Sequence, residues 1–257
     1  MIFLSDLDNT LIFSYKKLSA ENVCVERKDG KELSYMTPYG AELFSRIVKQ
    51  CVFIPVTTRS IEQYQRIVFP CGYVPEYAIC DNGGTLLING EPDPVWRQEF
   101  ENEYKLCSKE LDSCRKFLES CPEIYFEIRN VDSKFLFTKS RTPGETLEAM
   151  EKAVPSSGTV RLNNGDKIFS IPKGISKKRA ELKIRSMLGA EYTAAAGDSI
   201  FDIDMLSAAD IAIVKHGEIS DKVINKIQIT ETDTNDPDFV LKYINRLCGI
   251  INNIKEN

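Results

Sequence analysis

The chain has only one histidine, His216, and this scarcity limits the catalytic chemistry that the sequence can support. A nucleophile activated by an imidazole, as in a Ser–His or Cys–His pair, would have to use that single residue. We interpret His216, which precedes Gly217, as a solvated loop residue. Carboxylates and lysines are therefore the better candidates for any chemistry that the chain performs.

An excess of basic residues and a long apolar run are also missing. The chain has 33 Lys and Arg residues against 38 Asp and Glu residues, whereas a nucleic-acid-binding surface normally shows a basic excess. No apolar stretch approaches the ~18 residues that cross a membrane, and no charged segment leads into an apolar segment with a cleavage site. We expect a cytoplasmic protein without nucleic-acid or membrane partners, and a monomer or weak homodimer.

The eight cysteines include no pair at the CxxC spacing, which disfavours a zinc site. In a cytoplasmic chain the default is reduced, mostly buried thiols. Cys107, Cys114 and Cys121 recur every seven residues and would share roughly one face of a helix. We interpret them as small buried apolar residues.

Apolar strands alternate with helical patterns at both ends of the chain. The predicted strands cover 2–8, 51–59, 77–84, 193–198 and 211–214. One predicted helix begins after Thr37, and the other predicted helices cover 61–68, 177–188, 201–209 and 240–251. Strands that are apolar nearly throughout indicate a parallel sheet covered on both faces. The polar segment 14–34 reads as a small hairpin or flap.

The pattern differs in the middle of the chain. A long charged helix over 97–119, a second helix over 143–153 and four short alternating strands are predicted, the strands at 123–129, 133–139, 158–164 and 166–172. This order is typical of an antiparallel sheet with helices on one side. We predict an α/β fold with a Rossmann-like parallel core, residues 1–84 and 172–257, and an inserted α+β domain, residues 85–171.

Polar residues follow several of the predicted parallel strands or begin the next helix. They are Asp6, Asp8, Thr57, Thr58, Lys177, Asp198 and Asp202. Ligands of open α/β sheets bind at the carboxyl ends of the strands, so we expect these residues to converge at one edge. A purely structural role stays open for each of these residues. Asp6 and Asp8 could form a turn after the strand, Thr57 could belong to a Thr-rich strand, and Asp202 could complement the dipole of its helix.

The three aspartates Asp6, Asp8 and Asp198 would repel one another at that edge. A divalent cation would remove the repulsion, and few hard oxygen ligands with room for water and phosphate suit Mg²⁺. Lys177 lies in the first turn of a predicted helix, where a cation opposes the helix dipole. An anionic partner would offset this cost.

These segments together resemble the haloacid dehalogenase superfamily of phosphohydrolases. The matching segments are DLDNT (6–10), Thr57 before Arg59, GISK (174–177) and GDSIFDIDM (197–205), in the order of the family. The insert lies where the subgroup with a type IIB (C2B) cap carries its αββαββ domain. It looks like the caps of sucrose-phosphate phosphatase, mannosyl-3-phosphoglycerate phosphatase and phosphomannomutase.

The resemblance implies a role for each motif residue. Asp6 would be the nucleophile, and Asp8 would be the general acid and base and bind Mg²⁺ through its backbone carbonyl. Thr57 and Lys177 would hold the phosphoryl group, with Lys173 and Lys178 as competitors for the role of Lys177. Asp198 would be a further metal ligand. Asp202 would bind the metal through water or support Lys177. Further candidates for substrate binding are Thr58, Arg59 and Asn82.

The function that we expect is hydrolysis of a small phosphorylated metabolite, a sugar phosphate, through an aspartyl phosphate with Mg²⁺ as the cofactor. A phosphomutase that uses the same aspartyl phosphate is an alternative. A catalytically weak phosphate-binding regulatory module is another, although every motif residue is present. Residues of the insert that could select the substrate are Arg129, Lys134, Arg161, Asn163 and Lys167, each of which could also be an ordinary exposed strand residue.

Overall fold

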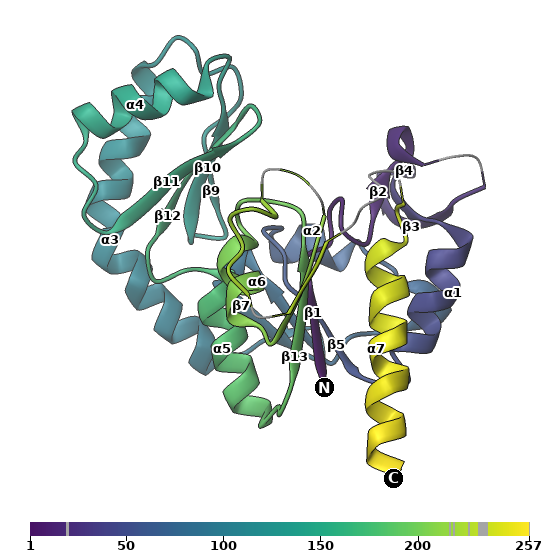
Figure 1. Ribbon diagram of the computed structural model, residues 1–257. Coiled ribbons are helices and arrows are strands. Elements are labelled where there is room, and N and C mark those ends of the chain that lie inside the picture. Colours follow the sequence, from purple (N-terminus) through teal and green to yellow (C-terminus); the bar gives the residue numbers. More distant parts are fainter. Residues whose placement is uncertain (19–20, 216, 218, 226, 231–235, 257) are drawn as a thin grey trace. The chain divides into compact units, whose positions relative to one another are not determined.

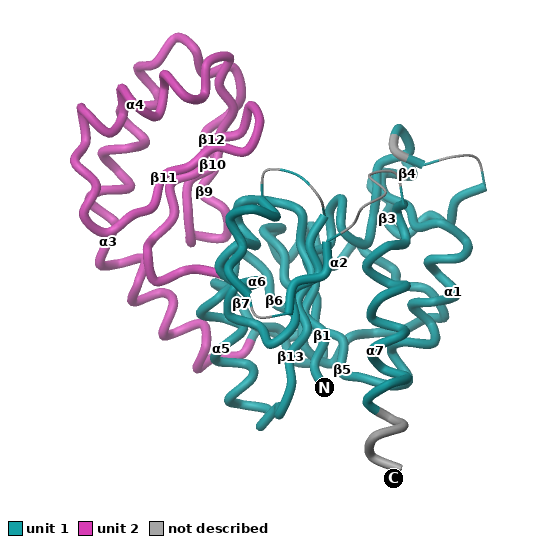
Figure 2. The backbone as a smooth tube through the Cα atoms, in the orientation of Figure 1, with its two compact units in different colours: residues 1–92, 177–257 teal, residues 93–176 magenta. Residues whose placement is uncertain are grey.

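The chain forms two compact units in the computed structural model (Figure 2). One unit comprises Met1–Pro92 and Lys177–Asn257, and the other comprises Asp93–Ser176. The structure describes residues 1–18, 21–215, 217, 219–225, 227–230 and 236–256. His216 lies outside the described residues, so its interpretation stays a prediction.

A five-stranded parallel sheet forms the centre of the first unit, with the strand order β15-β14-β13-β1-β5. Its strands are β1 (Ile2–Ser5), β5 (Val52–Pro55), β13 (Thr193–Gly197), β14 (Ile211–Val214) and β15 (Gln228–Thr230). The apolar runs at both ends of the sequence thus form one sheet, which confirms the predicted α/β class.

Helices cover both faces of this sheet, because its strands carry buried residues on both sides. Figure 1 shows α5 (Lys177–Leu188) and α6 (Ile203–Ala208) on one side, and α1 (Pro38–Ile47) and α7 (Phe239–Glu256) on the other. Phe3 and Phe53 from the sheet, Phe44 from α1 and Ile244 from α7 belong to one buried apolar cluster.

A small antiparallel sheet follows the first strand and corresponds to the predicted flap. It contains β2 (Phe13–Ser14), β3 (Val23–Lys28) and β4 (Lys31–Met36) in the order β2-β4-β3, with the short 3-10 helix η1 (Tyr15–Lys17) in between. Asp29 and Gly30 connect β3 to β4 with φ angles of 51° and 75°. A left-handed turn of this kind reverses the chain between two twisted strands.

The predicted third strand of the parallel sheet corresponds to β6 (Tyr77–Cys80), but β6 does not pair along its length with that sheet. Among the described residues, its pairing with that sheet consists of one isolated bridge between Val56 and Ile79. Its ladder is antiparallel to β7 (Thr85–Ile88), which pairs in turn with β8 (Glu91–Pro92). A 3-10 turn, η3 (Asp81–Gly83), reverses the chain there. The first unit therefore extends to Pro92, whereas the sequence-based boundary is at 84.

Two further short helices complete the connection between β5 and β6. They are α2 (Ile61–Gln65) and the 3-10 helix η2 (Pro70–Gly72). Ser60 caps α2 by accepting a hydrogen bond from the Gln63 N–H, and the Gln63 side chain accepts one from the Ser60 N–H. This capping box fixes the point where the chain leaves the sheet edge and enters α2.

The second unit is an antiparallel sheet with two helices on one face. Its elements are α3 (Pro94–Ser120), β9 (Arg129–Val131), β10 (Phe135–Lys139), α4 (Pro143–Ala153), β11 (Thr159–Asn164) and β12 (Lys167–Pro172), with the strand order β11-β12-β10-β9. Cys107 and Cys114 of α3 are buried with Met150 of α4 and Ile168 of β12. The two cysteines thus pack as predicted, whereas Cys121 follows the end of α3 and is half-buried.

Two details of the second unit differ from the predictions. The predicted strand 123–129 reaches regular pairing only at Arg129, because the preceding residues make isolated contacts with β10, among them a bond from the Thr138 hydroxyl to the Phe126 carbonyl. The side chain of Arg161 is completely buried and pairs with Glu110 at 3.1 Å. This arginine is therefore a structural cation of the second unit.

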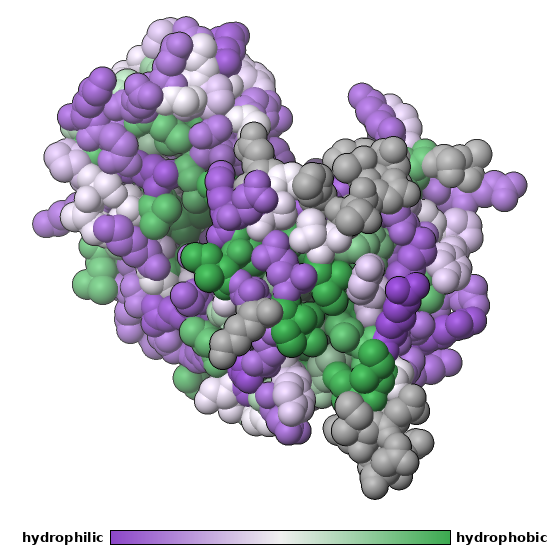
Figure 3. All heavy atoms as spheres, in the orientation of Figure 1, coloured by the Kyte–Doolittle hydropathy of each residue, from purple (hydrophilic) through white to green (hydrophobic). Residues whose placement is uncertain are grey.

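Hydrophilic and hydrophobic residues are interspersed on the face of the molecule that Figure 3 shows. Among the described residues, no helix is both long enough and apolar enough to cross a membrane. The longest helix, α3, is rich in charged residues throughout its length.

Candidate functional site

The strand register brings the first motif residues to one edge of the parallel sheet. Ser5, at the end of β1, is aligned with the ends of both β5 and β13. One residue later, the N–H of Asp6 donates to the carbonyl of Ala196 at 2.9 Å. Thr57 follows β5 and Asp198 follows β13, so these side chains leave neighbouring strands on either side of Asp6. This is the convergence that the strand ends predict.

Lys177 lies between two carboxylates at this edge. Its side chain is 0% exposed, and its Nζ lies 2.6 Å from Asp6 Oδ1 and 2.6 Å from Asp202 Oδ1. Burial alone would lower the pKa of Lys177, but the two carboxylates outweigh it and raise the pKa, so the side chain stays charged. The two lysines that could have taken the role of Lys177 lie elsewhere. Lys173 donates to a backbone carbonyl, and Lys178 is exposed.

The turn between β13 and α6 holds Asp202 in place. Its Oδ2 accepts hydrogen bonds from the Ser199 N–H at 2.9 Å and from the Ser199 hydroxyl at 2.7 Å, while Oδ1 faces Lys177. A Cβ atom at Gly197 would lie 2.4 Å from the Cβ of Asp202. Glycine is required at this position, since any side chain would displace the aspartate.

Three carboxylates gather around this lysine. One oxygen each of Asp6, Asp198 and Asp202 lies within 4.8 Å of the others, and Thr10 donates to Asp198 at 3.4 Å. Burial, opposed by Lys177 and reinforced by the neighbouring aspartates, raises the pKa of Asp6 well above its ordinary value. A single lysine leaves negative charge in excess, and a set of carboxylate oxygens fits a hard cation such as Mg²⁺.

The Asp8 carboxylate is not a member of this cluster and pairs with Arg59. The guanidinium Nε and Nη2 atoms of Arg59 each lie 2.7 Å from an Asp8 oxygen, and the Asp8 side chain remains 48% exposed. The other edge of the guanidinium contacts Glu26 on β3. Sequence reasoning missed Glu26, because a charged residue in an alternating strand normally faces solvent.

The remaining predicted residues lie around the end of β5. Thr57 is fully buried, its hydroxyl accepts from the Arg59 N–H at 3.1 Å, and its carbonyl accepts from the Asn82 N–H at 3.0 Å. Asn82 is buried in a left-handed conformation with φ 58°. Its side-chain oxygen has no hydrogen-bond partner in the part of the chain that the structure describes. Thr58, which lies between Thr57 and Arg59 in the sequence, is half-buried.

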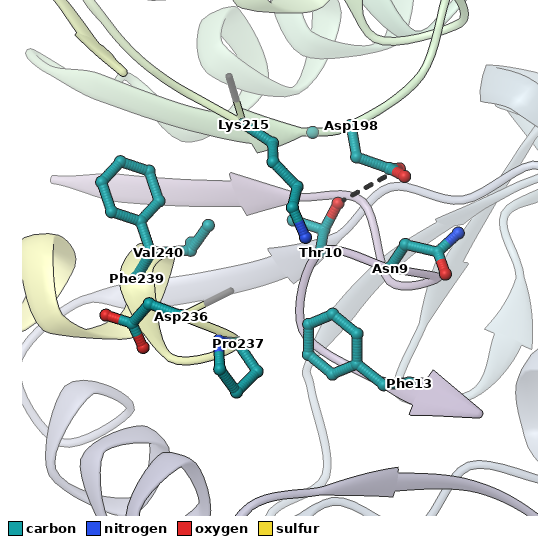
Figure 4. Close-up of a pocket in the computed structure, with 10 residues that line it drawn as sticks. Asn9, Thr10, Phe13, Asp198, Lys215, Asp236, Pro237, Phe239 and Val240 are labelled. Carbon is teal, nitrogen blue, oxygen red and sulfur yellow. Dashed lines mark hydrogen bonds between the residues drawn. The ribbon is translucent and has the colours of Figure 1, made fainter. Parts of the chain in front are cut away.

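A small pocket adjoins the Asp198 carboxylate (Figure 4). Its lining residues are Asn9, Thr10, Phe13, Gly197, Asp198, Lys215, Asp236, Pro237, Phe239 and Val240. The Lys215 side chain extends toward Thr10 in this view, and its Nζ lies 5.9 Å from the centre of the Phe13 ring. Lys215 was missed by sequence reasoning, since it follows β14 without a motif around it.

Several solved structures resemble the whole chain. A trehalose-6-phosphate phosphatase-related protein is 19% identical, with a TM-score of 0.57 over 98% of this chain and 100% of that one. The sucrose-phosphatase of Synechocystis, solved with sucrose and phosphate, is 12% identical, with a TM-score of 0.62 over 96% and 97% of the two chains.

A haloacid dehalogenase-like hydrolase from B. subtilis is 14% identical, with a TM-score of 0.65 over 96% of this chain and 99% of that one. No protein-family model and no curated protein matches the chain. At these identities the likeness establishes the fold, which is the one that the resemblance of the motifs implies. The chain has the haloacid dehalogenase-like fold, an α/β core into which an α+β unit of the C2B type is inserted.

Proposed function

We propose that this chain is a Mg²⁺-dependent phosphatase of a small phosphorylated metabolite. The observation that carries the proposal is the buried Lys177 held between Asp6 and Asp202, with Asp198 beside them at the carboxyl edge of the sheet. Burying a lysine among acids costs free energy, because each charge loses its hydration. Such a cost is expected where the buried charges bind a ligand. Binding of a phosphoryl group and a cation is a purpose that these charges fit.

The proposed substrate is a sugar phosphate. Two solved proteins with this fold that cover nearly the whole chain are a sucrose-phosphatase and a trehalose-6-phosphate phosphatase-related protein. Both names refer to phosphate esters of sugars, and the likeness to this chain extends over the inserted unit. The names support the substrate class by analogy only.

In the proposed reaction, a carboxylate oxygen of Asp6 attacks phosphorus, and the bond from phosphorus to the sugar oxygen breaks. Asp8 donates a proton to the departing oxygen. Water then attacks the aspartyl phosphate, and Asp8 takes the proton of that water as inorganic phosphate leaves and Asp6 is restored. Dividing one difficult displacement into two easier ones is the advantage of the covalent intermediate.

The other residues of the site stabilise charge and hold groups in position. Lys177 neutralises charge on the phosphoryl oxygens, and Thr57 adds its hydroxyl and the backbone around it. Mg²⁺, when bound, supplies further neutralisation of the transferred phosphoryl group. The residues that would hold it are Asp6, Asp198 and Asp202, with the Asp8 backbone carbonyl as the ligand that the resemblance implies.

The Asp8 side chain is half exposed, and Arg59 holds both of its oxygens. A general acid must reach the leaving oxygen and keep one orientation through the reaction. The exposed half of the side chain leaves one side of Asp8 open, and the bidentate pair with Arg59 fixes its orientation. The proton that Asp8 donates must then sit on the side of the carboxyl group that faces away from Arg59.

The proposal is tested with Asp6→Asn and p-nitrophenyl phosphate in the presence of Mg²⁺. We expect a clear wild-type rate and a loss of about 1,000-fold or more in the variant, because an amide is a poor nucleophile. Asp29→Asn, in the exposed turn of the flap, is the matched control and should keep the wild-type rate. A panel of sugar phosphates with release of inorganic phosphate as the readout then identifies the substrate.

Two results would count against the proposal. A wild-type chain that hydrolyses no ester on the panel would favour a phosphate-binding module. Transfer of the phosphoryl group to a second sugar hydroxyl, without release of inorganic phosphate, would identify a phosphomutase.

A further inference from the structure

Glu26 is a buried acid outside the cluster around Lys177. It lies on β3 of the flap, and its side chain is only 2% exposed. The neighbouring acid of the same hairpin, Glu32, is 44% exposed and pairs with Arg27 at the surface. Acidic residues are rarely buried unless their charge is compensated, so the position of Glu26 requires an explanation.

The flap is attached to the rest of the unit by contacts other than this carboxylate as well. The N–H of Val68 donates to the carbonyl of Val25 at 2.8 Å, and a backbone bridge joins Glu26 to Ile67. Val25 is 1% exposed and belongs to the main apolar cluster. Backbone pairing and apolar packing thus also attach β3 to the unit, in addition to the Glu26 side chain.

The Glu26 carboxylate is held by three side chains. Ser34 donates to it at 2.6 Å, Arg66 at 3.1 Å, and both terminal nitrogens of Arg59 lie within 3.0 Å of its oxygens. Burial opposes ionisation of this acid, but these hydrogen bonds outweigh burial and lower its pKa. The group is therefore a fixed negative charge near neutral pH.

Arg59 uses two edges of its guanidinium for two different acids. Nε and Nη2 face Asp8, while Nη1 and Nη2 face Glu26. The planar group has no remaining rotational freedom once both edges are occupied, since each bidentate contact fixes its plane. Nη1 also donates to the Gln63 carbonyl at 3.3 Å, but the shorter contacts are those to Glu26. Glu26 thus contributes most to the direction of the edge that faces Asp8.

We propose that Glu26 is a positioning residue for the reaction: it orients Arg59 so that the guanidinium holds Asp8 in the place from which Asp8 exchanges its proton. This inference rests on the proposed function, in which Asp8 is the general acid and base. Glu26 itself touches neither substrate nor phosphorus. Its effect reaches the reaction only through Arg59.

The test compares Glu26→Gln with Glu32→Gln, a matched loss of one carboxylate from the same hairpin. The readout is kcat/KM for p-nitrophenyl phosphate, whose leaving group needs no proton, and for an alkyl phosphate such as a sugar phosphate, whose leaving group does. We expect Glu26→Gln to lose about tenfold more on the alkyl ester than on the aryl ester. Glu32→Gln should leave both values unchanged.

Equal losses on the two esters would overturn the inference, because a general loosening of the fold weakens both reactions alike. Ser34→Ala, which removes one donor from the Glu26 carboxylate, replaces Glu26→Gln if the latter does not fold. It should show the same selectivity with a smaller loss.

A second measurement does not require activity. The Nε–H proton of Arg59, assigned by its disappearance in Arg59→Lys, should exchange slowly in the wild type and in Glu32→Gln and rapidly in Glu26→Gln. An unchanged signal in Glu26→Gln overturns the positioning role even if the enzyme is active. A wild type that hydrolyses no ester instead overturns the proposed function, and the proton signal still shows whether Glu26 orients Arg59.

Discussion

Single side chains with buried charge are the features of this molecule that apolar packing does not explain. Lys177 is completely buried together with two carboxylates. Replacement of such a group by an apolar side chain often stabilises a protein, because the desolvation of charges is costly. The charges of Lys177, Asp6 and Asp202 are therefore better explained by what they bind than by stability.

Glu181 is a second buried ionisable group, and it lies one helical turn after Lys177. One of its carboxylate oxygens accepts from the Thr193 hydroxyl at 3.2 Å, and the other has no hydrogen-bond partner among the described residues. Burial, partly opposed by Thr193 and Arg185, raises the pKa of Glu181 to about 7. No step of the proposed reaction uses this acid.

Glu181→Gln should therefore stabilise the protein in a pH-dependent way. Because the folded pKa lies above the ordinary value of 4.5, the native state binds a proton more tightly than the unfolded chain does. The wild type then loses stability as the pH rises from about 4.5 to 7. We expect the variant to gain about 2 kcal/mol at pH 8 and almost nothing at pH 4.5, measured by urea unfolding.

The exposed Glu191 provides the control. Glu191→Gln should not reproduce the gain at pH 8. A gain for Glu181→Gln of the same size at both pH values would show that the carboxyl group is not the cause.

At the scale of elements, the first and last helices of the chain are joined through their N-terminal ends. The Thr37 hydroxyl caps α1 by accepting from the Gly40 N–H at 2.8 Å, and it donates to Asp238 at 2.6 Å directly before α7. A Cβ atom at Gly40 would lie 2.4 Å from the Asp238 carboxylate. The glycine thus lets the start of α7 approach α1 closely.

Thr37→Ala should destabilise the first unit by about 1–2 kcal/mol, because it removes the cap and one donor to a buried carboxylate. Thr37→Ser keeps the hydroxyl and should cost less than about 0.5 kcal/mol. Thermal or urea unfolding of both variants provides the comparison. Equal losses in the two variants would mean that the methyl group, and not the hydroxyl, joins these helices.

At the scale of the whole molecule, a cation bound to the carboxylate cluster would add to the stability of the native state. A ligand that binds only the folded chain raises its melting temperature by mass action. With saturating Mg²⁺ we expect a rise of about 5 °C or more. The rise should disappear in Asp198→Asn, which removes a ligand without touching Lys177.

Asp204→Asn is the matched control, since Asp204 lies in the same segment, is exposed and is not a member of the cluster. It should keep the full rise in melting temperature. A rise of the same size in Asp198→Asn would place the cation elsewhere on the molecule. Because no turnover is measured, this result is independent of the substrate.

Much of the core could be predicted from local patterns. Apolar runs such as 2–5 and 193–197 form neighbouring strands of one parallel sheet, and the helices that begin at Pro38, Pro143 and Lys177 start where their residues indicate. Residues at strand ends then meet by geometry, because parallel strands place their carboxyl ends at the same edge. Asp6, Lys177, Asp198 and Asp202 come together in this way.

The sequence by itself thus determined the elements, the fold class and the acids at the sheet edge, since these depend on local periodicity and on where strands end. Only the tertiary structure decided that β6 turns back into a hairpin, that Asp8 pairs with Arg59, and that Glu26 supports this pair from the flap. These outcomes depend on which side chains of distant segments compensate each other's buried charge. The periodicity of residues along the chain does not predict which charged side chains of distant segments pair.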